Sequence, residues 1–367
     1  MEDVLKYDET GKTVVGVTDK NVWSVIIPQG VTSIGEKAFE DCKFLRSVAI
    51  PDSVTRIGDA AFGFCQSLAN INIPSSVTSI GEHAFSFCES LICIILPDKL
   101  TSIGQNAFWH CRSLSNIYIP KGVKHIEDGV FACCASLTEI NISEDNTSFC
   151  CKDGILYNKD MTSLLCAPVG KKDNSISIPD SVTSVRDWAF AGSKFLSTIV
   201  LPENLESIGH GAFAWCNSLK SMHIPDNVST IEAEAFRDCD SLVKVDLPAN
   251  ITTLSVFTFL DCGKLKEISI PNNVTILERG IFHGCKSLKA INIPPKTTKI
   301  DYWFVERCTS LRQIHMMVKS PETITVAKGS FDEDILDNLT LIVPQGSISK
   351  YERHPIFGKF KKIKEKI

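Results

Sequence analysis

The sequence predicts an α/β repeat solenoid, a chain in which one short repeat is copied and stacked many times. Three residue types predict it, because proline, cysteine and phenylalanine each recur at a spacing of 23 residues. A repeat of this length is too short to bury an apolar face alone, so each copy must pack on its neighbours and share one core. The prolines of the series are Pro28, Pro51, Pro74, Pro97, Pro120, Pro179, Pro202, Pro225, Pro248, Pro271 and Pro294.

One repeat reads S-L-x-x-I-x-I-P-x-x-V-T-x-I-G-x-x-A-F-x-x-C-x. The segment L-x-x-I-x-I alternates apolar and exposed positions, which predicts a short strand, and successive strands should stack into a long parallel sheet. Proline closes the strand because it has no N–H to donate. We expect V-T-x-I-G to turn the chain and A-F-x-x-C to form one short helical or 3₁₀ turn that places Ala, Phe and Cys in the core.

The series breaks in the middle of the chain. Ser143 stands where a proline is due, and the next complete strand end is Ile178. The inserted residues 149–168 predict a hairpin, with strands at 154–158 and 163–166. Either the hairpin fills the place of one repeat, or it is a binding protrusion. The predicted organisation is an N-terminal cap (1–21), a first repeat block (22–142), the inserted hairpin segment (143–173), a second repeat block (174–316) and a C-terminal cap (317–367).

The two caps should close the ends of the apolar core. Residues 1–21 are mostly polar. At the other end Ile356, Phe360, Ile363 and Ile367 recur at helical spacing, with lysines between them, which predicts an amphipathic helix that covers the last repeat.

Residues with reactive side chains also follow the repeat. Glu82, His83 and Cys88 lie within seven residues, but Cys88 belongs to the cysteine series and the other two occupy variable positions. We therefore expect scaffold rather than a catalytic or metal site there. The ten serial cysteines should be reduced, because stacked residues have parallel Cβ vectors, while Cys150 and Cys166 flank the hairpin and have the option of pairing across it. No catalytic motif or C-x-x-C is found, so no enzyme activity, cofactor or metal is expected.

Composition excludes two further classes. The net charge of −5 gives no positive field for nucleic acid, and no apolar run is long enough to cross a membrane. The N-terminal residues do not have the basic and apolar segments of a signal peptide.

The repeat resembles that of the BspA-like leucine-rich-repeat family, in the I-P-x-x-V-T-x-I-G-x-x-A-F-x-x-C motif from about Val22 to Met316 and in the D-G-x-L-Y-N hairpin. The resemblance implies a right-handed leucine-rich-repeat superhelix, placed at the cell surface or outside the cell, that binds other proteins or a host matrix. The alternative compartment is the cytoplasm. We expect a monomer that does not insert into a membrane.

Function on such a solenoid should lie on the exposed strand face. The candidate partner-binding residues are Ile95, Tyr118, Asn141, Glu139, Asn72, His223 and Asp246. Ile95 and Tyr118 stand out because they are large and adjacent, and tyrosine is enriched at binding hot spots. Two alternatives remain open: a structural spacer with no specific ligand on that face, and a carbohydrate-binding module, which would need more aromatic rings than Tyr118 in this row.

Overall fold

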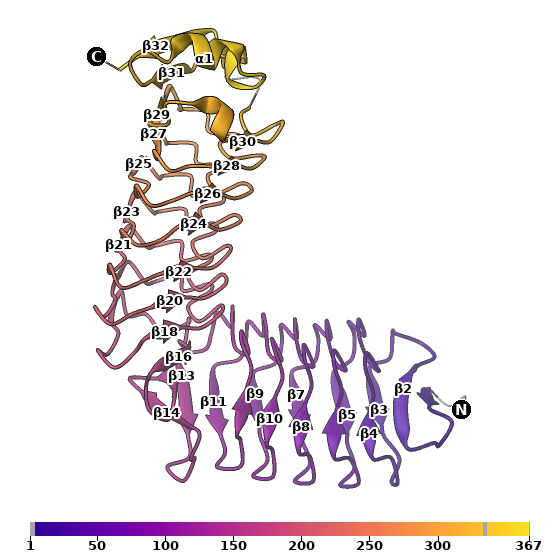
Figure 1. Ribbon diagram of the computed structural model, residues 1–367. Coiled ribbons are helices and arrows are strands. Elements are labelled where there is room, and N and C mark those ends of the chain that lie inside the picture. Colours follow the sequence, from indigo (N-terminus) through magenta and orange to yellow (C-terminus); the bar gives the residue numbers. More distant parts are fainter. Residues whose placement is uncertain (1–3, 333–335, 367) are drawn as a thin grey trace. The chain divides into compact units, whose positions relative to one another are not determined.

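The computed structural model describes residues 4–332 and 336–366 (Figure 1). Its backbone forms two compact units. The first unit comprises Met1–Lys172 and Arg186–Ser193, and the second comprises Asp173–Val185 and Lys194–Ile367. Each unit is a β-solenoid of stacked repeats.

The expected strand of each repeat is present and pairs in parallel with the same strand of the next repeat. Asn70 lies opposite Cys93 and Asn72 opposite Ile95, so the register shift between neighbours is one full repeat. In the first unit these strands are β3 (Ser24–Ile26), β5 (Ser47–Ala49), β7 (Asn70–Asn72), β9 (Cys93–Ile95), β11 (Asn116–Ile119) and β13 (Glu139–Ile142). In the second unit they are β17 (Ser175–Ser177), β19 (Thr198–Val200), β21 (Ser221–His223), β23 (Lys244–Asp246), β25 (Glu267–Ile268), β27 (Ala290–Ile293) and β29 (Gln313–Met316).

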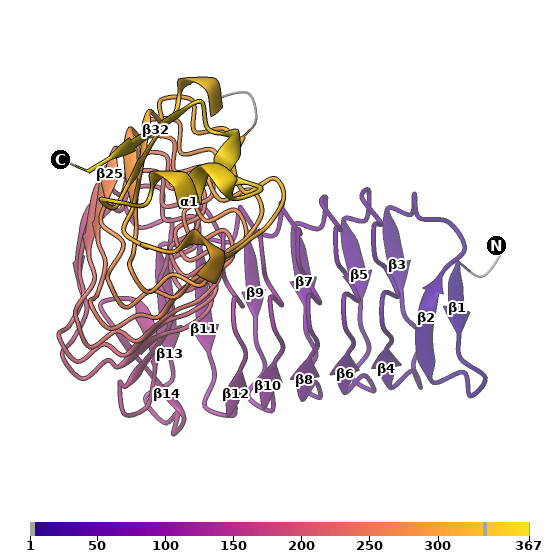
Figure 2. The same ribbon diagram turned by 45° about the horizontal axis from the view of Figure 1, so that its top comes forward.

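A second row of strands replaces the turn that was expected at V-T-x-I-G. Its two-residue strands also stack in parallel, and Figure 2 shows both rows side by side in the first unit. Threonines tie the row together, since Thr78 Oγ1 donates to the Thr55 carbonyl at 3.1 Å and Thr101 Oγ1 to the Thr78 carbonyl at 2.9 Å. The row comprises β4 (Ser33–Ile34), β6 (Arg56–Ile57), β8 (Ser79–Ile80), β10 (Ser102–Ile103), β12 (His125–Ile126), β18 (Ser184–Val185), β20 (Ser207–Ile208), β22 (Thr230–Ile231), β24 (Thr253–Leu254), β26 (Ile276–Leu277), β28 (Lys299–Ile300) and β30 (Thr325–Val326).

The A-F-x-x-C segment is not the short helical turn that was expected. Two residues of each segment adopt left-handed backbone angles, as in His83 (φ 52°) and Phe87 (φ 60°). This geometry points alternate N–H groups along the stack, so the Phe62 N–H donates to the Ala84 carbonyl of the next repeat at 2.7 Å. The repeats between residues 4 and 320 contain no helix.

The core is a stack of the serial phenylalanines and cysteines. Phe85 is fully buried between Phe62, at a centroid distance of 5.3 Å, and Phe108, at 5.4 Å, with the rings nearly parallel. Cys88 beside it donates from Sγ to the Phe62 carbonyl at 3.2 Å. The expectation of reduced thiols is confirmed, because all 15 cysteines are free.

The insertion is a three-stranded antiparallel meander, one strand more than the expected hairpin. It comprises β14 (Phe149–Lys152), β15 (Ile155–Asn158) and β16 (Ser163–Cys166). Cys150 and Cys166 are not paired; Cys150 lies opposite Tyr157 and Cys166 opposite Leu156, so they face different residues of β15.

The two ends are closed by different elements. At the N-terminal end β1 (Leu5–Tyr7) and β2 (Thr13–Val17) form an antiparallel pair, and β2 continues into the second row. At the C-terminal end the prediction of an amphipathic helix is wrong. The 3₁₀ helix η3 (Phe357–Lys359) is followed by a strand, β32 (Lys362–Glu365), which pairs with β31 (Thr340–Val343). Ile367, the last residue of the predicted helix, lies outside the described residues. The remaining helices are η1 (Pro321–Thr323), η2 (Leu336–Asn338) and α1 (Ile348–Arg353).

Candidate functional site

The predicted site residues of the first unit lie together on the exposed face of the first strand row. Strand alternation buries Ile94 and Ile117 and therefore turns Ile95 and Tyr118 outward, with 77% and 53% of each residue exposed. These two side chains, at the same position of neighbouring repeats, form what we call the strand-face patch.

Polar predicted residues border this patch. Asn72 lies opposite Ile95 in the β7–β9 pair, Asn141 lies opposite Tyr118 in the β11–β13 pair, and Glu139 lies opposite Asn116. All three are exposed. An apolar centre with a polar border is the usual composition of a protein–protein contact surface.

The other two predicted residues, His223 and Asp246, belong to the second unit. They lie opposite each other in the β21–β23 pair, and Lys244 makes a 2.8 Å ion pair with the Asp246 carboxylate. With Lys244 they form a polar surface on the second unit, beside Val200, which is 55% exposed at the same row position of β19.

A second exposed apolar pair on the first unit was not predicted. Ile26 is 77% exposed and occupies the same row position as Ile95, and Trp23 is 62% exposed with the Arg46 guanidinium 4.8 Å from its ring centroid. Comparing the row position across all repeats would have revealed Ile26, since most of its counterparts are polar or small.

A polar hollow of about 500 Å³ lies beside the meander in the first unit. Lys124, His125 and Glu127 line it, together with a bidentate pair in which Arg186 Nε and Nη2 each lie 2.9 Å from Asp128. The hydrogen bond that Arg186 donates to the Asp128 carboxylate raises the pKa of Arg186. The two central charges of the hollow are therefore paired with each other.

The reactive residue types of the serial motif are structural. Burial raises the pKa of Cys88 far above its usual range and that of Cys42 to about 11, so neither thiol is a nucleophile near neutral pH. Glu82 and His83 are exposed and 3.7 Å apart. Within residues 4–332 and 336–366, no group of three His, Cys, Asp or Glu side chains is placed to hold a metal ion.

The stacked strands, the serial core and the exposed strand face define the class of leucine-rich-repeat solenoids. The chain belongs to the BspA-type leucine-rich-repeat family, whose model (a region of six copies) matches residues 32–160, 170–278 and 255–352. No relative is found among curated protein sequences.

Solved bacterial structures share the fold. A leucine-rich repeat protein from Eubacterium ventriosum superposes with a TM-score of 0.75 at 24% identity, covering 87% of each chain. The pneumococcal vaccine antigen PcpA gives 0.71 at 26% identity, covering 98% of this chain and 82% of that one. A leucine rich cell surface protein from Faecalibacterium prausnitzii gives 0.58 at 27% identity, covering 85% and 92%. No helix in the described part of the chain is long and apolar enough to cross a bilayer.

Proposed function

We propose that this chain is a non-enzymatic protein-binding scaffold that contacts its partner through the strand-face patch. One observation carries the proposal: Ile95 and Tyr118 are each more than half exposed on neighbouring strands of the same face. Covering an exposed isoleucine side chain contributes roughly 1.5–3 kcal/mol, so an isoleucine beside a tyrosine supplies the centre of a contact surface.

The proposed location is the cell surface or the exterior of the cell. Its support is the similarity to the leucine rich cell surface protein and to the pneumococcal vaccine antigen. In this setting the partner is a host-matrix or cell-surface protein, and binding amounts to adhesion by complementary surfaces without covalent chemistry.

Two alternatives make different predictions. A spacer would bind nothing specific through the strand face, although Ile95 and Tyr118 would remain exposed. A glycan binder on this face would need several aromatic platforms, and the exposed row of strands β3 to β13 holds a single aromatic ring, that of Tyr118.

The test is capture from a panel of purified matrix and cell-surface proteins. We compare the wild-type chain with an Ile95→Ser, Tyr118→Ala double variant and with Ile26→Ser, a matched control because Ile26 is also 77% exposed on the same row. We expect the double variant to lose the partner at unchanged thermal stability while the control keeps it. Equal capture by all three would move the site off this patch, and capture by none would favour the spacer.

A further inference from the structure

Three aromatic rings surround one arginine in the second unit. The Arg279 guanidinium carbon lies 4.8 Å from the ring centroid of Phe257, 5.7 Å from that of Tyr302 and 5.8 Å from that of Trp303. Tyr302 and Trp303 are 38% and 43% exposed and meet edge to face at 5.4 Å. We call these four residues the arginine cluster.

The repeat spacing builds this cluster from three successive repeats. Phe257, Gly280 and Trp303 occupy the same left-handed position, with φ angles of 55°, 61° and 62°. A side chain on Gly280 would collide with the Phe257 ring, so glycine in the middle repeat lets that ring lie over the backbone. The Phe257 and Trp303 rings thereby stack on each other at a centroid distance of 6.4 Å, and Arg279, which precedes Gly280, lies beside both.

The hydrogen-bonding capacity of Arg279 is largely unused. Nη1 donates to the Tyr302 hydroxyl at 3.3 Å, while Nε is buried with no acceptor. Among the described residues, no carboxylate lies within salt-bridge distance of this guanidinium.

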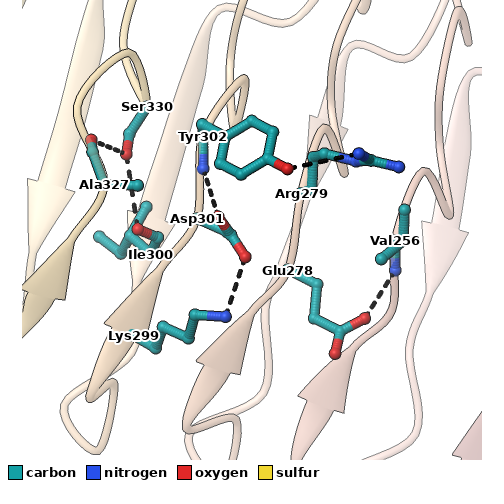
Figure 3. Close-up of polar contacts among 9 residues, drawn as sticks. All are labelled: Val256, Glu278, Arg279, Lys299, Ile300, Asp301, Tyr302, Ala327 and Ser330. Carbon is teal, nitrogen blue, oxygen red and sulfur yellow. Dashed lines mark hydrogen bonds and ion pairs between the residues drawn. The ribbon is translucent and has the colours of Figure 1, made fainter.

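The nearest acidic side chains are held by other partners, as Figure 3 shows. Asp301 accepts from Lys299 Nζ at 2.9 Å and from the Tyr302 N–H at 2.8 Å. Glu278 accepts from the Val256 N–H at 2.9 Å. Burial opposes ionisation of Asp301, but the hydrogen bonds from Lys299 and the Tyr302 N–H, and the charges of Lys299 and Arg279, lower its pKa. Arg279 thus acts on Asp301 through space without a direct ion pair. The cluster is a cation beside three aromatic rings that can still bind a carboxylate with the planar fork of its guanidinium.

We propose that the arginine cluster binds a carboxylated sugar, a uronic or sialic acid. The sugar carboxylate accepts from the terminal N–H groups of Arg279, and the Tyr302 hydroxyl donates to the carboxylate or to a neighbouring sugar oxygen. The apolar C–H face of the pyranose ring packs on Trp303. An acidic peptide side chain has the same carboxylate but only one or two CH₂ groups to cover the exposed rings, so an acidic sugar fits both features better. This site is independent of the strand-face patch, because it lies in the other unit.

The test titrates methyl β-D-glucuronide, methyl α-sialoside, methyl β-D-glucoside and N-acetylglutamate amide into the full chain, followed by saturation-transfer NMR. We expect one of the acidic sugars to bind at least tenfold more tightly than the neutral glucoside and the amino-acid carboxylate. Arg279→Lys, which keeps the charge and loses the fork, and Trp303→Ala should each lower that affinity about tenfold or more. Arg307→Lys is the matched control, because Arg307 is an exposed arginine of the next repeat, and it should bind as the wild type does.

Thermal melting checks that each variant is folded, and Tyr302→Phe serves as a second, milder variant that removes only the hydroxyl. The proposal is overturned if neither acidic sugar binds up to roughly 20 mM, or if the glucoside binds equally well. It is also overturned if N-acetylglutamate amide binds as tightly as the sugars, which would indicate an acidic peptide instead. Unchanged affinity in folded Arg279→Lys and Trp303→Ala would mean that the cluster only braces the repeats.

Discussion

Replacing Phe85 by alanine tests whether the aromatic stack holds the first unit together. Phe85 is fully buried and stacks on Phe62 and Phe108 at 5.3 and 5.4 Å. Removing a buried phenylalanine side chain costs about 3–5 kcal/mol through lost transfer energy and the remaining cavity. Each stacked pair adds about 0.5–1.5 kcal/mol, and Phe85 has two, so we expect a loss at the upper end of the range, about 4–5 kcal/mol.

The assay is urea-induced unfolding of the chain, followed by tryptophan fluorescence, with Trp109 and Trp188 as reporters in the first unit. The matched control is Phe64→Ala, because Phe64 is 40% exposed and stacks only on Phe87, at 4.6 Å; it should cost less than about 1.5 kcal/mol. A loss below about 2 kcal/mol for Phe85→Ala, or equal losses for both variants, would refute the reasoning, because the stack would then relax into the space instead of leaving a cavity.

Three further predictions concern thiols, pH and the sheet edge. Cys93 is exposed, Cys150 and Cys151 are half-buried and the serial cysteines are buried. In a Cys150→Ser, Cys151→Ser background, Cys93→Ser should therefore abolish fast labelling of the native protein by a thiol reagent at pH 7; persistent fast labelling there would mean that the buried thiols open to solvent. Burial and then Arg112 lower the pKa of His110 below 6.5, so the folded state binds fewer protons than the unfolded chain, and the stability of the first unit should fall as pH drops below about 6.5. Urea unfolding at pH 7.5 and at pH 5 should show a smaller loss of stability for His110→Phe than for the wild type. An identical loss in both would mean that another group causes the pH dependence. β32 is the outer strand of its sheet, and lysines discourage another strand from pairing with such an edge. The double variant Lys362→Val, Lys364→Thr should therefore form dimers or larger species, detected by size-exclusion chromatography with light scattering. A monomeric variant would contradict this role of the lysines.

The first strand row and the core followed from the sequence because one residue type recurs at each buried position. Phe85 and Cys88 were placed in the core, and the outward direction of Ile95 and Tyr118 was expected, from spacing and strand alternation alone. These features depend on contacts between residues one repeat apart, and the repeat itself displays those contacts.

The second strand row and the left-handed turns could not be predicted from the sequence. A two-residue strand such as Ser79–Ile80 is too short to show alternation. The left-handed positions hold residues such as His83 and Phe87 in place of the glycine that usually marks them. The C-terminal helix was mispredicted because Ile363 sits in K-I-K-E, which fits an alternating strand as well as a helix, and pairing with β31 decides between the two.

Of the two candidate sites, one could be predicted from the sequence and the other could not. The strand-face patch was visible in the sequence because its members share one repeat position. The arginine cluster was not, since Phe257, Arg279 and Trp303 are 22 and 24 residues apart and come together only through the left-handed turns. An alignment of the repeats that compares Phe257, Gly280 and Trp303 column by column would have pointed to it.

The threonine bonds that link the second row have a genetic consequence. Thr78 Oγ1 donates to the Thr55 carbonyl and Thr101 Oγ1 to the Thr78 carbonyl. Where Lys124 stands at the threonine position, its backbone N–H still donates to the Thr101 carbonyl at 2.9 Å, so these successive repeats are linked in the same way. A recombination event that adds or removes one complete 23-residue copy therefore leaves every remaining rung with an equivalent neighbour, whereas gain or loss of a single residue inside a strand turns its buried side chains outward. The gene can thus change length in whole repeats, and a lineage can vary how many rungs its binding face spans without redesigning the core.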